Sequence, residues 1–160
     1  MVQNIKEVPY GVSDFQTMVE QNIYYVDKTM YIPELEKQAR YLIFIRPRRF
    51  GKSIFLGMLH AYYDVRTKHK FQRWFGNLWI GKHPTPLQGR YQVMHLDFSQ
   101  VGGNIDNLEE KFNFYMGVQL DGFVRDYVEF YSDELRQKVN ATQDAGGKLA
   151  LIQSEAKVKE

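Results

Sequence analysis

Apolar residues near the start of the chain recur with the period of a helix. Phe15, Met18 and Val19 fall on one face, and Ser13 followed by Gln16 forms a capping-box pattern just before them. The sequence therefore predicts a short helix that begins beside Ser13 and turns its apolar face toward a core.

The next thirty residues alternate between strand and helix patterns. The stretch "IYYVDKT" is rich in β-forming residues and predicts a short strand that ends at Asp27. Thr29 is a suitable cap for a helix over about residues 30–40, with Pro33 tolerated in its first turn. Residues 1–40 are thus expected to form a helix, a strand and a helix.

Residues 41–64 combine a strand pattern with a helix pattern. The run "YLIFI" is continuously apolar and of strand length, which is typical of a buried strand in a parallel sheet. After a basic loop, four apolar side chains share one stripe of a predicted helix: Phe55, Met58, Leu59 and Tyr62. Strand, loop and helix in this order form one unit of an α/β fold.

The rest of the chain predicts an insertion, a second strand and two helices. Residues 65–90 are polar and irregular, and their apolar side chains suggest a small cluster of their own: Phe71, Trp74, Phe75, Leu78, Trp79 and Ile80. The stretch "YQVMHLDFS" predicts a strand with Asp97 at its carboxyl end. Helices are predicted over about residues 107–131 and, after a turn, over residues 148–159.

This order of elements predicts an α/β domain with a parallel sheet. A parallel sheet grows by returning from each helix into a new strand, yet the patterns give only two core strands. We therefore expect the chain to be the N-terminal portion of a larger domain. Its expected parts are residues 1–40, the loop unit 41–64, the insertion 65–90, and residues 91–160 with the second strand and helices.

The stretch "RPRRFGKSI" has the composition of a phosphate-binding loop. Gly51 lets the backbone approach a phosphate, Lys52 would reach the β- and γ-phosphates, and Ser53 would bind Mg²⁺. Arg46 stands where such loops usually have a leading glycine, and the following Pro47 favours an extended backbone there. The predicted nucleotide-binding residues are Arg46, Arg48, Arg49, Phe50, Gly51, Lys52, Ser53 and Ile54.

Two other interpretations of this loop stay open. Gly-Lys-Ser is a common tripeptide and can occur by chance in a segment that caps a helix. The cluster of Arg46, Arg48, Arg49 and Lys52 can also contact a nucleic-acid backbone or the acidic face of a partner protein. The chain would then be a non-catalytic binding module.

Composition and charge exclude several classes of function. The 160 residues include 21 Lys and Arg, 19 Asp and Glu and no Cys, so the chain is no polycation and has no disulfide, cysteine zinc site or thiol nucleophile. The four histidines lack the spacing of metal ligands, and no serine has evident triad partners. No apolar run reaches membrane-spanning length and the start lacks a signal peptide's apolar core, so we expect a cytoplasmic protein that contacts no membrane.

Three stretches resemble the AAA-ATPase-like proteins of bacteria: "VPYGVSDFQTMVEQNIYYVDKTMYIPELE", "FIRPRRFGKSIFLGMLHAYYD" and "LWIGKHPTPLQGRYQVMHLDFSQV". The resemblance covers nearly the whole chain, and the arginine-headed loop is that family's own variant of the Walker A loop. It implies a P-loop NTPase-like three-layer fold that binds ATP and Mg²⁺. In full-length relatives it also implies a PD-(D/E)XK nuclease-like domain, through which nucleic acid could be bound.

The resemblance also bears on residues outside the loop. Tyr25, Asp27 and Lys28 match the family's "YVDKT" element, whose charged groups could contact nucleotide or form a structural ion pair, and we favour the structural role. The family's Walker B strand, which ends in Asp-Glu-Tyr-Asp, is not in this sequence. Asp97 matches an earlier strand and is a second candidate ligand of Mg²⁺ beside Ser53. We expect this chain alone to bind nucleotide without hydrolysing it.

Overall fold

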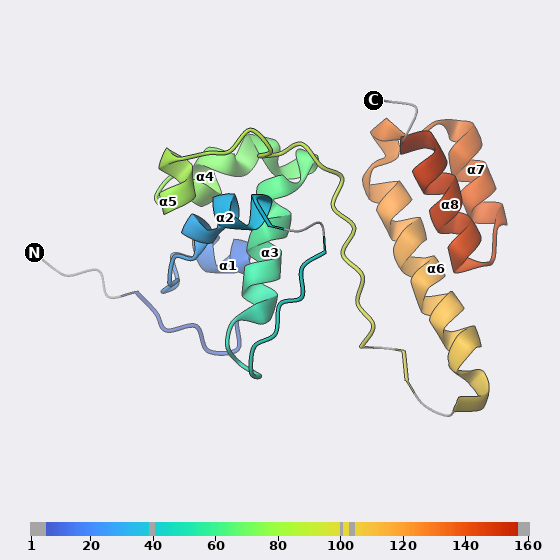
Figure 1. Ribbon diagram of the computed structural model, residues 1–160, viewed down its shortest axis with the longest axis horizontal. Helices are drawn as coiled ribbons and strands as arrows, with labels where there is room; N and C mark the ends of the chain where they lie inside the picture. The colour runs from blue at the N-terminus through green and yellow to red at the C-terminus, as the bar shows by residue number, and fades with distance from the viewer. Residues whose placement is uncertain (1–5, 39–40, 100, 103–104, 157–160) are drawn as a thin grey trace, which may run out of the picture. The chain divides into compact units, whose positions relative to one another are not determined.

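The computed structural model describes residues 6–38, 41–99, 101–102 and 105–156. The chain divides into two compact units, residues 1–93 and residues 94–160. Helices make up the regular structure of both units (Figure 1). The predicted loop, the "YVDKT" element and most of the aromatic residues belong to the first unit.

The first unit contains one long helix, α3, and several short ones (Figure 1). Helix α3 packs against α1, and α1 in turn contacts α4. The chain-order bounds are α1 (Phe15–Glu20), η1 (Thr29–Tyr31), α2 (Ile32–Glu36), α3 (Lys52–Tyr63), η2 (Val65–Lys70), α4 (Phe71–Phe75) and α5 (Trp79–Lys82), where η marks a 3₁₀ helix.

The prediction of a P-loop NTPase-like three-layer α/β fold with a parallel sheet is wrong for this structure. The described residues contain no β-strand, and their only β-type pairing is an isolated parallel bridge between Asp64 and Tyr91. The "YLIFI" run is irregular, and Tyr41, Ile43 and Ile45 are each more than four-fifths exposed. The stretches expected as strands at residues 23–27 and 91–99 are irregular as well.

The physical reason is that a strand exists only when another segment supplies its hydrogen-bond partners. An apolar run alone is therefore not enough to predict a strand, because helices can supply the apolar side chains of the core instead. Here they do so: the buried side chains come from α1 to α5, namely Phe15, Ile32, Phe55, Met58, Ala61, Tyr62, Trp74, Phe75 and Ile80.

The aromatic residues of the expected insertion belong to this core. Trp74 and Phe75 are almost completely buried, and the ring of Phe75 lies 5.1 Å from that of Phe15 and 5.6 Å from that of Tyr62. Residues 71–80 therefore pack with α1 and α3, where the sequence suggested a separate apolar cluster. Such aromatic pairs add to the stability that burial alone provides.

The predicted helix after the loop is confirmed as α3. Phe55, Met58 and Tyr62 are buried along one stripe, and Leu59 packs against them. The predicted first helix is present as α1, but its cap is Asp14 rather than Ser13: the Asp14 carboxylate accepts from the Thr17 backbone N–H at 2.7 Å. The helix expected over residues 30–40 is shorter, ending with α2, and residues 39–40 lie outside the described part of the chain.

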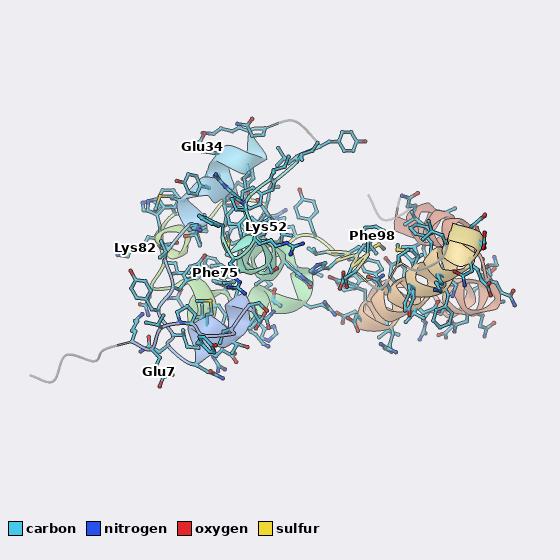
Figure 2. The ribbon with its side chains drawn as sticks, turned by 90° about the horizontal axis from the view of Figure 1, so that it is seen from below. Glu7, Glu34, Lys52, Phe75, Lys82 and Phe98 are labelled. Carbon is cyan, nitrogen blue, oxygen red and sulfur yellow. The ribbon has the colours of Figure 1, made fainter. Side chains whose placement is uncertain are left out.

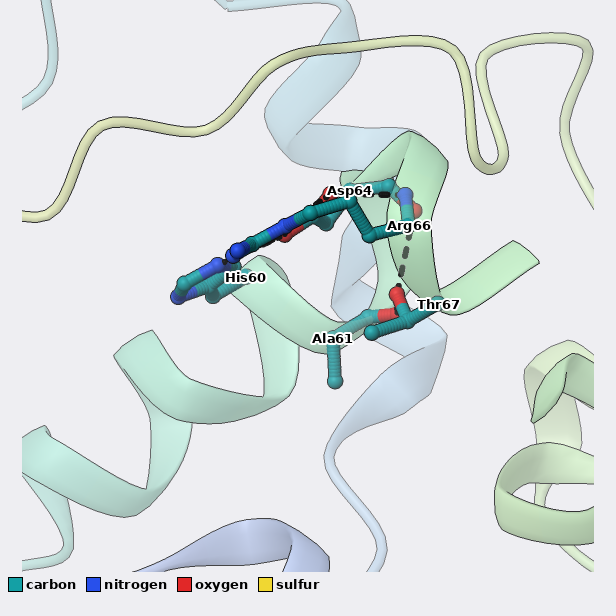
Figure 3. A network of polar contacts seen from close by, with 5 residues as sticks. All are labelled: His60, Ala61, Asp64, Arg66 and Thr67. Carbon is teal, nitrogen blue, oxygen red and sulfur yellow. Dashed lines mark hydrogen bonds and ion pairs between the residues drawn. The ribbon is translucent and has the colours of Figure 1, made fainter. Parts of the chain in front are cut away.

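A buried carboxylate fixes the carboxyl end of α3 (Figure 3). Asp64 is fully buried, and its Oδ2 lies 3.0 Å from His60 Nε2 and 3.0 Å from a terminal guanidinium nitrogen of Arg66. Its Oδ1 also accepts from the Arg66 backbone N–H, which starts η2. Beside it, the Thr67 hydroxyl donates to the carbonyl of Ala61 at 2.9 Å. The turn from α3 into η2 is therefore held by side chains as well as by backbone.

The second unit is a group of helices that pack on one another (Figure 1). Their bounds are η3 (Ile105–Asn107), α6 (Leu108–Asp126), η4 (Val128–Phe130), α7 (Asp133–Ala141) and α8 (Ala145–Ala156). Helix α8 contacts both α6 and α7, and the buried Lys148 pairs with Asp121 across the α6–α8 contact.

The helices of the second unit differ from the prediction in two ways. Helix α7 was not predicted, although Ser132 caps it and Leu135 and Val139 are buried on one face. Helix α8 begins within the expected turn, and residues 157–159 of the expected final helix lie outside the described residues. Among the helices that are described, none is both long and apolar enough to cross a membrane.

The exposure of the "YLIFI" run gives a first prediction. Ile43→Lys should change the free energy of unfolding by less than about 0.5 kcal/mol, because the side chain is 88% exposed. Phe44→Ala should cost more, about 1 kcal/mol, because this ring stacks on buried Phe55 at 5.0 Å. Urea denaturation of both variants tests the pair. A loss above about 2 kcal/mol for Ile43→Lys would contradict the exposed position.

Candidate functional site

The loop before α3 has two residues in the left-handed backbone conformation. Arg49 has φ +66° and Gly51 has φ +72°, on either side of Phe50. Glycine adopts this conformation without the steric cost that other residues have, so Gly51 is the better suited of the two. Turns of this kind direct successive backbone N–H groups to one side, where they can bind an anion.

Helix α3 starts without a side-chain cap. Gly51 occupies the N-cap position and accepts the first helical hydrogen bond, from the Phe55 N–H at 2.9 Å. The N–H groups of the first turn have no acceptor within the helix, and they carry the positive end of its dipole. Lys52, Ser53 and Ile54 supply these N–H groups, so the start of α3 is suited to an anionic ligand.

The amine of Lys52 turns back onto the loop. Its Nζ donates to the carbonyl oxygen of Arg46 at 2.6 Å and to that of Pro47 at 3.0 Å. An ammonium group has three N–H donors, so one donor remains after these two bonds. Lys52 therefore ties the entry of the loop to the start of α3 and keeps one donor for a ligand.

A cleft of about 800 Å³ opens over the start of α3. One wall is the loop and the first turn of α3, and the other is the segment of residues 9–13 before α1. Its lining has two arginines and a lysine and no acidic residue: Pro9, Tyr10, Gly11, Val12, Ser13, Arg48, Arg49, Gly51, Lys52, Ser53 and Ile54. A cleft so lined favours negatively charged ligands.

The structure brings six of the eight predicted loop residues to this cleft, namely Arg48, Arg49, Gly51, Lys52, Ser53 and Ile54. The other two are exposed and do not line it. Arg46 lies over the ring of Phe44 at 5.7 Å, and the Phe50 side chain is 63% exposed. The Ser53 side chain is exposed on the first turn of α3.

Sequence reasoning missed residues 9–13 as the opposite wall of the cleft. The signal that could have found them is the stretch "VPYGVSDFQ", which carries part of the resemblance described above. Gly11 in this stretch has φ +73°, so a turn there requires glycine or a similarly tolerant residue.

Asp97, the second predicted ligand of Mg²⁺, belongs to the second unit. Its Oδ1 accepts from the Ser99 backbone N–H at 2.8 Å and its Oδ2 from the Ser99 hydroxyl at 3.0 Å. These bonds, with a smaller contribution from the charge of His95, lower the pKa of Asp97, whose carboxylate therefore stays ionised. Gln119 of α6 bonds to both the backbone N–H and the carbonyl of Asp97, which fixes residue 97 on that helix.

Asp27 and Thr29 of the "YVDKT" element have a structural role. Asp27 Oδ1 accepts from the Thr29 N–H at 2.8 Å and from its hydroxyl at 2.7 Å. Asp27 Oδ2 accepts from the Trp79 N–H at 2.7 Å, and the Thr29 Oγ1 accepts from the Ile80 N–H at 3.1 Å. Asp27 and Thr29 therefore satisfy the first N–H groups of α5, and no ion pair with Lys28 is present among the described residues.

A family described as "Predicted AAA-ATPase" matches residues 9–159, nearly the whole chain. The chain belongs to this AAA-ATPase-like family. The match includes both walls of the cleft.

Part of the chain is similar to a longer protein. An "Uncharacterized protein in vnfD 5'region" of Azotobacter chroococcum mcd 1 is 35% identical over 85 residues, which is 49% of this chain and 16% of that protein. The matched part thus spans about a sixth of that relative's length. No solved structure is significantly similar to the chain.

The contacts of Asp27 lead to a second prediction. Asp27→Ala leaves three donors without their acceptor and should lower the free energy of unfolding by about 2 kcal/mol. Asp27→Asn keeps one carbonyl acceptor and should cost less. Thermal unfolding of the two variants measures the difference. Equal melting temperatures for Asp27→Ala and the wild type would contradict the structural role.

Proposed function

We propose that the loop and first turn of α3 bind the phosphates of a nucleoside triphosphate, ATP in the presence of Mg²⁺. The observation that carries this proposal is the start of α3: an uncapped helix N-terminus beside a left-handed Gly51, in a cleft lined by three cationic side chains and no acidic one. Membership of the AAA-ATPase-like family supports the same ligand class.

The residues present fit a phosphate chain. The N–H groups of Lys52, Ser53 and Ile54 supply donors at the positive end of the helix dipole. The Lys52 amine keeps one donor after its bonds to Arg46 and Pro47, and Arg48 and Arg49 add charge that can pair with phosphate oxygens in bidentate fashion. These groups are suited to hold the phosphate chain and to offset much of its negative charge.

A bound Mg²⁺ would neutralise charge between phosphate oxygens, and it prefers oxygen ligands. The Ser53 hydroxyl, exposed at the start of α3, is the side chain that we propose as its protein ligand. Asp97 stays a prediction of the sequence alone. The described residues contain no group of three His, Cys, Asp or Glu side chains that could hold a metal ion by themselves, so the metal would come with the nucleotide.

For longer proteins of this family we propose that nucleotide binding controls an attached nuclease-like domain. This proposal rests on the family resemblance, and the matched relative is several times longer than the part that this chain matches. The proposal for the present chain is limited to binding of the nucleotide.

The third prediction tests nucleotide binding directly. At a MgATP concentration a hundred times its Kd, the wild type should gain about 2.7 kcal/mol of stability, which appears as a raised melting temperature. Lys52→Ala should lose this shift. Lys82→Ala is the matched control, because Lys82 is an exposed lysine on α5 outside the cleft (Figure 2). Equal shifts for wild type and Lys52→Ala would contradict the proposed site.

The same variants distinguish nucleotide binding from binding of a nucleic-acid backbone by the basic cluster. A backbone-binding module should bind duplex DNA with an affinity that falls steeply with salt, and Lys52→Ala should reduce the salt slope by about one ionic contact. Under the nucleotide proposal, MgATP raises the melting temperature at physiological salt and DNA does not.

A further inference from the structure

Lys28 brings a second amine to the loop from a distant part of the sequence. Its Nζ lies 3.7 Å from the point that a Cβ would occupy at Gly51, so the amine is beside the backbone of the loop's left-handed glycine. The two residues are separated by more than twenty positions in sequence, and the contact is made because residues 24–28 run alongside the start of α3.

Lys28 lacks a counterion in the part of the chain that the structure describes. It is partly buried and makes no ion pair or side-chain hydrogen bond there. The neighbouring carboxylate is already occupied, because both Asp27 oxygens accept from Thr29 and Trp79. A partly buried ammonium without an acidic partner is available to an anion that binds beside it.

The described residues that line the small cleft beside Lys28 include no acidic one. This cleft, of about 160 Å³, is lined by Pro9, Met18, Tyr24, Tyr25, Val26, Lys28, Gly51, Ile54 and Phe55. This cleft shares Pro9, Gly51 and Ile54 with the larger cleft. Lys28 and Lys52 therefore approach the same short stretch of backbone, Gly51 to Ile54, from two adjoining clefts.

Tyr25 lines the same small cleft as Lys28 and packs against the core. Its ring packs edge-on against buried Phe15 at 5.3 Å, and its buried hydroxyl makes no hydrogen bond of normal geometry among the described residues, although the Lys28 backbone N–H lies nearby. Burial, helped by the charge of Asp27 and opposed by the Lys28 backbone N–H, raises the pKa of Tyr25 to about 12. Tyr25 is thus neutral at physiological pH and adds no negative charge that could pair with Lys28.

We propose that Lys28 is a second phosphate-binding lysine, which contacts the same phosphate chain as Lys52 from the other side of Gly51. This inference rests on the proposed function of the loop. It adds which phosphate ligands the site prefers. With Lys28, Arg48, Arg49 and Lys52 around one stretch of backbone, the site selects ligands by the number of phosphates that they carry. Inorganic triphosphate and nucleoside triphosphates are bound better than pyrophosphate and nucleoside monophosphates.

The test compares variants that remove one charge each. Titration calorimetry measures the Kd of ATP, inorganic triphosphate and pyrophosphate for the wild type, Lys28→Met, Lys52→Ala and the control Lys82→Met. Lys28→Met keeps most of the length of the side chain and should weaken the binding of ATP and inorganic triphosphate about tenfold, the effect expected for one charge-assisted contact. It should also narrow the preference for triphosphate over pyrophosphate, whereas Lys82→Met should change neither.

A second readout separates ligand binding from a structural role. In the absence of ligand, Lys28→Met should melt at or above the temperature of the wild type, because it removes a partly buried cation that has no acidic partner among the described residues. A lowered melting temperature would overturn the proposal in favour of a structural lysine. Unchanged affinity in Lys28→Met together with lost affinity in Lys52→Ala would overturn it while leaving the proposed function intact. If the wild type itself binds neither ligand, the proposed function fails and this inference fails with it.

Discussion

Burial of one face of α3 is the constraint on which the first unit depends. Phe55, Met58 and Tyr62 place that face in a core shared with α1 and α4, and buried Asp64 with its polar partners fixes the carboxyl end of the helix. With its length and one end fixed, α3 cannot shift along its axis. Its N-terminus is consequently held at one place, uncapped and beside the cleft. The candidate site is thus a consequence of how this helix packs.

Electrostatics explains why that uncapped end suits an anion. Positive charge accumulates there from the helix dipole, from Lys52 and from the two arginines that line the cleft, and the cleft lining contains no acidic residue. The acidic side chain of the "YVDKT" element, Asp27, instead accepts a hydrogen bond from the first N–H of α5. Asp14, Asp27 and Asp64 are used at the starts of helices, so these three carboxylates leave the cations of the loop available for a ligand.

What the sequence could predict was local. The 3.6-residue period predicted α3, and the residue types from Gly51 to Ser53 pointed to the loop as a candidate site, because both signals lie within a dozen neighbouring residues. The strands could not be predicted from "YLIFI" and "YQVMHLDFS", since strand formation depends on a partner elsewhere in the chain. The position of Lys28 beside Gly51 is equally non-local, and no spacing rule signals it.

The most direct test of the central claim observes the backbone N–H groups at the start of α3. An amide NMR titration of the chain with MgATP should give its largest shifts at residues 51–54, with smaller ones at residues 9–13 of the facing wall. That pattern is expected if phosphates bind at the uncapped end of the helix. Shifts spread over exposed lysines and arginines of both units, or none at residues 51–54, would contradict the account.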